Sequence, residues 1–378
     1  MSAIMDLCEL SPAYIRAIAP YQPGKPISEL AREFGLDERA IVKLASNENP
    51  RGISPKALAA VKAALPELAR YPDGFDLTQA LSRRLGVSMQ QIVLGNGSND
   101  VLEMAGMAFL APDCSAVYSQ HAFAVYPLAT QARGALSIVT PAKNFGHDLE
   151  AMLAAIRPDT RIVFIANPNN PTGTMITAAE LESFLARAPK NVVIVVDEAY
   201  NEYLDPALRC PSIDWIARFP NLIVTRTFSK IYGLAGLRVG YAVCHAEVAA
   251  LLNRVRQPFN VNNLAIVAAA AALEDKDFLR ESYALNASGM QQLQEGCKRL
   301  GLSWIPSYGN FVSIKIPRSR GGGEGRSQAG AVFQKLLQRG VIVRPLAGYA
   351  MPDHLRVTIG LAAENACFLE ALEAVLKA

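Results

Sequence analysis

The sequence has little net charge and few histidines. It contains 37 Lys and Arg residues against 34 Asp and Glu, for a formal net charge of +3, and only four His among 378 residues. This balance argues against a dedicated nucleic-acid-binding protein, which would carry a strongly basic surface. Charged residues make up 19% and apolar types 51% of the chain, which indicates a folded globular protein rather than a disordered one.

Long hydrophobic runs and paired cysteines are also missing. No uncharged apolar run approaches the roughly 18 residues that a membrane span needs, and the start, MSAIMDLCEL, lacks the basic region of a secretory signal. The cysteines show no CxxC or other paired spacing: Cys8, Cys114, Cys210, Cys244, Cys297 and Cys367. We therefore expect no metal site, six packing residues, and a reducing, cytoplasmic compartment.

The length exceeds the ~250–300 residues at which single cores usually split, so we expect two domains. We place an N-terminal arm at residues 1–46, a large domain at 47–263, and a small C-terminal domain that packs with the arm at 264–378. Prolines punctuate the arm at Pro12, Pro20, Pro23 and Pro26. Such arms often lie across a partner surface, although a loose terminus fits the composition equally well.

Short apolar runs recur through the middle of the chain, with helical windows between most of them. These runs cover residues 92–97, 115–119, 136–140, 161–167, 191–197, 221–227 and 238–243. Buried strands that alternate with helices indicate an α/β fold with a mainly parallel sheet. Sheets of this kind bind ligands at the carboxyl ends of their strands, so the loops after the strands should hold the chemistry.

The C-terminal region has a different pattern. After an Ala-rich segment, 264–273, and a charged helix through residue 300, we expect strands at 310–315, 341–344 and 354–359 and helices at 331–339 and 364–377. This order predicts a compact α+β unit. The segment RSRGGGEGRS (318–327) is interpreted as a flexible surface loop, because it lacks the spacing of a phosphate-binding glycine motif.

Lys230 stands in TRTFSKIYGLAGLRVGY (225–241), directly after an apolar run. Small residues let the backbone approach a ligand closely, and Ser229 and Arg238 suit an anion. A lysine beside a bound phosphate is the arrangement expected for a Schiff base with pyridoxal phosphate. Taken alone, however, the segment fits a structural lysine in a glycine-rich turn better.

Asp197 ends the apolar run NVVIVVD, which places it at the carboxyl edge of the sheet. A buried carboxylate needs a cationic partner or several donors, and the protonated pyridine nitrogen of pyridoxal phosphate is such a partner. Tyr200 follows and is positioned to donate its phenol to the ring oxygen of the same coenzyme. The alternatives are a helix cap for Asp197 and a packing role for Tyr200.

Two further turns follow predicted strands. NPNNPTG (167–173) forms a rigid turn in which the Asn170 amide is a candidate donor to the ring oxygen, and the isomer of the Asn170–Pro171 bond is left open. GNGSND (95–100) joins a strand to a helix, so the backbone N–H groups of Ser98 and Asn99 are candidates for phosphate binding. Each turn is weak evidence alone, because turns and caps use the same residues.

The order of these motifs resembles the class I/II, fold-type I pyridoxal-phosphate-dependent aminotransferases, and most closely the histidinol-phosphate aminotransferase subfamily. The resemblance runs nearly end to end and includes YQPGKP (21–26), KLASNENP (43–50), ARYPDG (69–74), GVIVRPL (340–346) and LRVTIG (355–360). The first, second and last of these segments point to the subfamily. It implies a seven-stranded, mainly parallel large domain, a smaller α+β domain, pyridoxal 5'-phosphate as cofactor, and a homodimer.

The resemblance also implies residue roles. Lys230 forms the Schiff base and moves protons, Asp197 pairs with the pyridine nitrogen, and Tyr200 and Asn170 bind the ring oxygen. The phosphate is held by Ser98, Asn99, Ser229, Arg238 and, from the neighbouring subunit, Tyr71. Phe123 stacks on the ring where the family commonly has Tyr, and Asn99 stands where it more often has Asp.

For the substrates, the resemblance assigns Arg356 to the α-carboxylate of the amino-acid partner and places Asn47 nearby. Arg344 would contact the phosphate of histidinol phosphate, with a structural role as the alternative, and Tyr21 would close over the side chain. These roles imply transamination between histidinol phosphate and 2-oxoglutarate/glutamate in histidine biosynthesis.

Three alternatives share the motifs in part. An aromatic amino-acid aminotransferase uses the same scaffold, and so does a phosphothreonine decarboxylase. A cofactor-binding regulator without turnover would carry a DNA-binding domain, for which the residues ahead of KLASNENP leave no room. A comparison of histidinol phosphate with phenylalanine as amino donor separates the first alternative.

Overall fold

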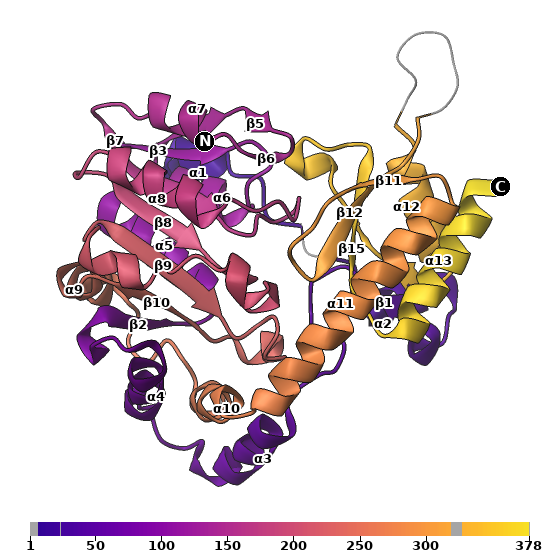
Figure 1. Cartoon of the computed structure of the whole chain (residues 1–378), viewed down its shortest axis with the longest axis horizontal. Coiled ribbons are helices and arrows are strands. Elements are labelled where there is room, and N and C mark those ends of the chain that lie inside the picture. The colour runs from indigo at the N-terminus through magenta and orange to yellow at the C-terminus, as the bar shows by residue number, and fades with distance from the viewer. Residues whose placement is uncertain (1–6, 23, 319–326, 378) are drawn as a thin grey trace, which may run out of the picture.

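The computed structural model describes residues 7–22, 24–318 and 327–377. They form a large unit around a seven-stranded sheet and a smaller unit, which lies to the right in Figure 1. The predicted surface loop at 318–327 lies outside the described residues except for its two ends. None of the helices in the described part of the chain combines the length and hydrophobicity that a bilayer-spanning helix needs.

The large sheet has the order β2-β10-β9-β8-β7-β3-β4. Its strands are β2 (Ile92–Gly95), β3 (Ser115–Ser119), β4 (Leu136–Thr140), β7 (Thr160–Ala166), β8 (Val193–Asp197), β9 (Leu222–Thr227) and β10 (Gly240–Cys244). All neighbours pair in parallel except β10, which is antiparallel to both β2 and β9. This confirms the predicted seven-stranded, mainly parallel sheet.

Helices cover both faces of the sheet. The helices of the large unit are α3 (Pro55–Ala64), α4 (Phe75–Leu85), α5 (Ser98–Phe109), α6 (Val125–Gln131), α7 (Leu149–Ala154), α8 (Ala178–Arg187), α9 (Ala246–Val255) and α10 (Asn263–Leu273). Side chains from α5, α6 and α9 share one core with one face of the strands, and those from α3, α4, α7, α8 and α10 share a second core with the other face. Because both faces are covered, the central strands β7, β8 and β9 are mostly apolar.

Helix α10 belongs to the core of the large unit, which differs from the predicted boundary at 263/264. Four of its six alanines, Ala265, Ala268, Ala269 and Ala272, are buried, and α10 contacts α3 and α4, which lie beside it at the bottom of Figure 1. The small side chains allow close helix packing, so the Ala-rich composition that suggested a new domain reflects burial. We propose that the large unit extends through Leu273 and that the small unit begins with α11 (Lys276–Arg299).

The small unit is an antiparallel sheet with helices packed on it, the predicted α+β arrangement. Its sheet has the order β11-β12-β15-β14, from β11 (Ser303–Ile305), β12 (Phe311–Lys315), β14 (Arg344–Pro345) and β15 (His354–Thr358). The helices α11, α12 (Ala329–Gln338) and α13 (Ala362–Lys377) contribute to its core. The long helix α11 runs diagonally between the two units in Figure 1.

The strand predicted at 341–344 is divided in two. β13 (Val341–Ile342) pairs in parallel with β1 (Val42–Lys43), whereas β14 pairs antiparallel with β15. Pro345 has no N–H for a continuous ladder, and the chain changes sheets at this point. The change brings Arg344 to the interface of the two units.

The later part of the predicted arm belongs to the small unit. α2 (Ile27–Phe34) forms a core with α12 and β13, in which Leu30 and Ile41 contact the small unit through Leu337 and Ile342. On these contacts we propose that the arm packs with the small domain, as expected. Residues 7–18, with the short α1 (Ala13–Arg16), expose Leu7 and Leu10.

Candidate active site

A cavity of about 350 Å³ lies where the carboxyl ends of β7, β8 and β9 face the small unit. Every predicted site residue except Tyr71 lines it: Tyr21, Asn47, Ser98, Asn99, Phe123, Asn170, Asp197, Tyr200, Ser229, Lys230, Arg238, Arg344 and Arg356. They come from the loops after parallel strands, from the segment that leads into α3, and from β14 and β15. The residues predicted for the chemistry therefore lie together near the strand ends, and their roles stay predictions.

Asp197 presents a buried carboxylate to this cavity. The residue is 5% exposed, and burial raises its pKa, although donated hydrogen bonds oppose the rise. Tyr126 Oη donates to Oδ2 at 3.0 Å, and Thr225 Oγ1 donates to Oδ1 at 3.1 Å. The Ala199 backbone donates a further hydrogen bond, yet the pKa stays raised, so the carboxylate gains from a cation in the cavity.

Lys230 lies across the cavity with its amine close to the backbone of the opposite wall. Nζ donates to the Ser46 carbonyl at 3.3 Å and lies 5.8 Å from the centre of the Tyr200 ring. Burial, and then the positive charge of Arg356, lower the pKa of Lys230 to about 8, while Glu48 opposes the shift. The amine is therefore a neutral nucleophile in about a tenth of molecules at pH 7, far more than for an ordinary lysine with a pKa of about 10.4.

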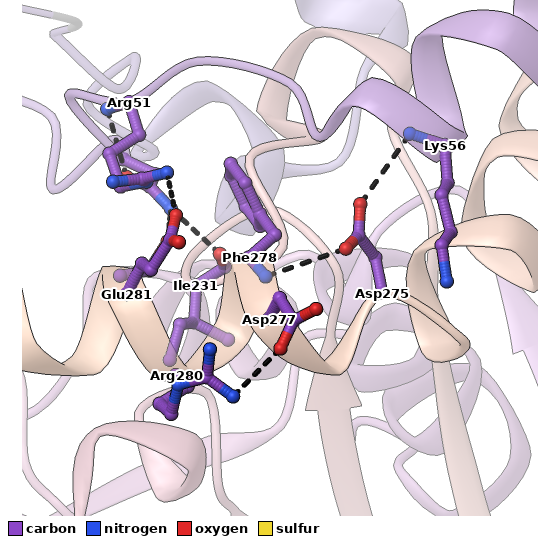
Figure 2. A network of polar contacts seen from close by, with 10 residues as sticks. Arg51, Lys56, Ile231, Asp275, Asp277, Phe278, Arg280 and Glu281 are labelled. Atoms are coloured by element: carbon purple, nitrogen blue, oxygen red, sulfur yellow. Dashed lines mark hydrogen bonds and ion pairs between the residues drawn. The ribbon is translucent and has the colours of Figure 1, made fainter.

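The segment after Lys230 is tied to the small unit. Asn49 Nδ2 donates to the Ile231 carbonyl at 2.7 Å and to Ser282 Oγ at 3.0 Å. Figure 2 shows the neighbouring contacts, in which Arg51 forms an ion pair with Glu281 of α11. These contacts hold the backbone of the lysine segment against both units.

We predict that Lys230 reacts with amine reagents at lower pH than ordinary lysines. In protein without coenzyme, limited acetylation across pH 6–11, read by peptide mass spectrometry, should be half-maximal near pH 8 at Lys230 and near about 10.4 at exposed lysines. The neutral amine reacts, so a lowered pKa moves the curve to lower pH. Arg356→Gln removes a positive charge and should move it upward. A half-point near 10 in the wild type would contradict the burial of the amine.

Tyr200 and Asn170 are held as hydrogen-bond donors beside the cavity. Tyr200 Oη accepts from Asn47 Nδ2 at 2.9 Å, which leaves its own proton to donate, and burial raises its pKa to about 12. Asn170 Oδ1 accepts from Arg356 Nη1 at 2.5 Å, so its donor is Nδ2. The Asn170–Pro171 bond is cis, as is Asn167–Pro168. Both side chains suit an oxyanion.

The N-terminus of α5 forms an anion-binding corner of the cavity. Its cap residue, Gly97, has φ of 83° and no capping side chain, so backbone N–H groups of the first turn are available. Arg238 lies so close that a Cβ at Gly97 would be 2.5 Å from its Nη2, and its Nη1 is 3.4 Å from Ser229 Oγ. Helix end, hydroxyl and guanidinium together suit a phosphate.

Arg356 places a second cation on the other side of the cavity. It is 6% exposed, its Nη2 donates to the Ala45 carbonyl at 2.6 Å, and its Nε has no hydrogen-bond partner among the described residues. A buried donor without a partner is costly, so this guanidinium is suited to an anionic ligand. Arg344 lies nearer the arm, where its Nη2 donates to the Gln22 carbonyl at 2.7 Å and its guanidinium lies 5.4 Å from the Tyr21 ring.

Tyr71 lies outside this cavity. Its side chain is 80% exposed and stacks on Phe259, with ring centres 4.3 Å apart. This position is compatible with the predicted role in a neighbouring subunit, which stays a prediction.

Several residues of the site were not predicted. Ser46, Glu48 and Tyr349 line the cavity, and Tyr126 contacts Asp197. Tyr126 lies in the same motif, HAFAVY (121–126), as Phe123, but its sequence gives no signal of a contact with Asp197. Within the described residues, no group of three or more His, Cys, Asp or Glu residues could hold a metal ion.

This chain is similar to known proteins in both sequence and structure. The profile of the class I and II aminotransferases matches residues 39–372. The chain is 58% identical to histidinol-phosphate aminotransferase 2 of Nitrosospira multiformis (99% of this chain, 93% of that protein) and 61% identical to histidinol-phosphate aminotransferase 1 of Dechloromonas aromatica (98% and 100%). The structure of histidinol-phosphate aminotransferase from Sinorhizobium meliloti with pyridoxal-5'-phosphate matches with a TM-score of 0.87 at 28% identity, covering 97% of both chains. L-threonine-O-3-phosphate decarboxylase from Porphyromonas gingivalis shares the fold, with a TM-score of 0.77 at 21% identity. The match covers 89% of this chain and 100% of that chain.

Proposed function

Because the chain belongs to the class I and II aminotransferase family, we propose that it is a pyridoxal-phosphate-dependent aminotransferase. Its substrates are histidinol phosphate and 2-oxoglutarate, and the transfer of the amino group is a step of histidine biosynthesis. The observation that carries this proposal is one cavity in which Lys230, Asp197 and Arg356 meet. The names of its full-length relatives support the same activity.

The residues present fit pyridoxal phosphate. Asp197 supplies a buried negative charge for the ring nitrogen, Tyr200 and Asn170 supply donors for the ring oxygen, and Phe123 supplies an aromatic surface. The anion-binding corner is formed by backbone groups of Ser98 and Asn99 together with Ser229 and Arg238. When bound, the coenzyme supplies an aldehyde and an electron-withdrawing ring that make the Cα–H bond of an amine substrate acidic.

Lys230 and Asp197 have separate roles in the proposed reaction. With its pKa lowered to about 8, the Lys230 amine would hold the coenzyme through its aldehyde and, when free, would serve as the base for the proton on the substrate Cα. Asp197 holds positive charge on the ring nitrogen, because the carboxylate is buried and fixed by Tyr126 and Thr225. The two half-reactions use the same cavity in turn, which predicts ping-pong kinetics.

Two arginines suit the two substrates. Glutamate has an α-carboxylate, for which Arg356 offers a buried guanidinium with an unused Nε. Histidinol phosphate instead carries a phosphate, for which Arg344 is available at the mouth of the cavity beside Tyr21. Asn47 orients Tyr200 and thereby contributes to the substrate side of the site.

A competition between amino donors tests the substrate. With 2-oxoglutarate as acceptor, kcat/KM for histidinol phosphate should exceed that for phenylalanine by at least about tenfold, because a charge-assisted contact to phosphate contributes about 1.5–3 kcal/mol. Arg344→Gln should lower kcat/KM for histidinol phosphate about 10- to 100-fold and change that for phenylalanine by less than about threefold. A tenfold preference for phenylalanine would instead assign the enzyme to aromatic amino acids.

The proposal includes a homodimer in which Tyr71 serves the partner's cavity. Exposed apolar side chains surround Tyr71 on the same segment: Leu65, Leu68 and Phe75, with Phe259 stacked beside it. Surface of this kind is typical of a subunit interface.

Mixed dimers test the placement of Tyr71. If Tyr71 acts across the interface, dimers of Tyr71→Ala with the inactive Lys230→Ala contain one intact site, and random mixing should restore about a quarter of wild-type activity. If Tyr71 acts in its own subunit, mixed dimers have two defective sites. Native mass spectrometry shows whether mixed dimers have formed. If they have, and the activity of the mixture still equals the sum of the activities of the two variants measured separately, the proposal is contradicted.

A cytoplasmic location completes the proposal. Cys114, Cys210, Cys244, Cys297 and Cys367 are free thiols, and burial raises the pKa of Cys210, Cys244 and Cys297 to about 12. Such thiols are packing residues of low reactivity, as is usual in a reducing compartment.

A further inference from the structure

Tyr126 is completely buried on α6, behind the cavity. Its ring stacks on Phe164, with centres 4.9 Å apart and planes at 4°, and meets the edge of Phe123 at 5.9 Å. In this apolar layer, its hydroxyl donates to Asp197 Oδ2 at 3.0 Å. Burial and then the charge of Asp197 raise the pKa of Tyr126 well above its usual value, so the phenol stays protonated and acts as a donor.

The two carboxylate oxygens of Asp197 have separate donors from separate elements. Thr225, the register partner of Asp197 on the neighbouring strand β9, donates to Oδ1, and Tyr126 donates to Oδ2 from a helix on one face of the sheet. Rotation of the carboxylate would break at least one of these bonds. The bond from Tyr126 also lowers the pKa of Asp197 more than any other contact of the carboxylate does, against the effect of burial.

We infer that Tyr126 is a positioning residue that orients the Asp197 carboxylate and keeps it charged for the coenzyme ring. The inference rests on the proposed function, because it concerns how Asp197 meets the ring nitrogen. Without the hydroxyl, the carboxylate keeps only the bonds from Thr225 and the Ala199 backbone, so its protonation becomes easier. A neutral Asp197 cannot form an ion pair with a protonated ring nitrogen.

Binding of pyridoxamine phosphate tests this role without the covalent bond to Lys230. Tyr126→Phe keeps the ring that stacks on Phe164 and removes one oxygen atom. We expect its dissociation constant for pyridoxamine phosphate at neutral pH to rise about tenfold. The matched control is Tyr118→Phe, a buried tyrosine in the same apolar cluster, which should stay within about twofold of wild type.

The pH dependence gives a readout that a packing defect would not move. A protonated Asp197 loses its attraction for the ring, so affinity falls as the pH drops through the pKa of Asp197. Because removal of the Tyr126 hydroxyl raises that pKa, the fall in Tyr126→Phe should begin at higher pH than in wild type or Tyr118→Phe.

A double-mutant cycle shows whether Tyr126 acts through Asp197. In the Asp197→Asn background, Tyr126→Phe should change the dissociation constant by less than about twofold. An equal tenfold loss in both backgrounds, an unchanged affinity, or a Tyr126→Phe protein that does not fold where Tyr118→Phe folds would each assign Tyr126 a purely structural role and overturn the inference. Wild-type protein that does not bind pyridoxamine phosphate would contradict the proposed function and this inference together.

Discussion

Lys230→Ala is expected to lower the turnover number by at least about 10³-fold. The substitution removes both the nucleophile that bonds the coenzyme and the base that takes the Cα proton, and general acid–base catalysis alone contributes about 10²–10⁴. The cavity that surrounds Lys230 offers no second lysine among its described lining residues. Steady-state transamination with histidinol phosphate and 2-oxoglutarate measures the loss.

Two controls accompany this variant. Lys335→Ala changes an exposed lysine of α12 and should retain wild-type turnover. In Lys230→Ala, a small amine such as methylamine should restore part of the rate, because it fills the space of the missing side chain and supplies the base. Borohydride treatment should leave the coenzyme attached to residue 230 only in the wild type. Near wild-type turnover of Lys230→Ala would exclude the proposed chemistry.

Asp197→Asn is expected to lower turnover by roughly 10²–10³-fold, the loss typical of removing one preorganised electrostatic group. Asparagine preserves the shape of the side chain and can still accept from Thr225, but it has no charge to hold a proton on the ring nitrogen. Affinity for the coenzyme should fall as well. Turnover above about a tenth of the wild-type value would contradict the role of the carboxylate.

The same substitution should leave the fold intact. The pKa of Asp197 is raised by burial, so its charge costs folding free energy at pH values above the unfolded pKa, and removal of the charge should maintain or raise the unfolding temperature without coenzyme. Loss of activity together with retained stability separates a catalytic effect from unfolding. Asp214→Asn, at an exposed position, is the matched control and should change neither quantity.

Local structure was largely predictable from the sequence. The strands expected at 310–315 and 354–359 agree with β12 and β15 to within one residue at either end, and the helices expected at 331–339 and 364–377 agree with α12 and α13 to within two. Caps and periodic apolar residues determine such boundaries locally. The prediction differed at α10 and at residues 341–344, where a buried helix and a change of sheet depend on neighbours that are distant in the sequence.

The candidate site, too, was predictable from the sequence only in part. Asp197 and Lys230 follow buried strands, and parallel strands bring their carboxyl ends to one edge, so the sequence sufficed to place both residues in one cavity. Tyr126 and Thr225 were not predicted as partners of Asp197, because nothing in the local pattern of a helix or strand specifies which polar groups meet across layers.

The order of strand-end residues thus determined the fold class, the cofactor class and most of the cavity wall, because these depend on residue type and periodicity. Only the tertiary structure decided which donors hold Asp197, how Arg356 and Asn170 meet, and that burial brings the pKa of Lys230 to about 8. Desolvation and hydrogen-bond geometry depend on atoms from many parts of the chain, so neither is determined until the chain has folded.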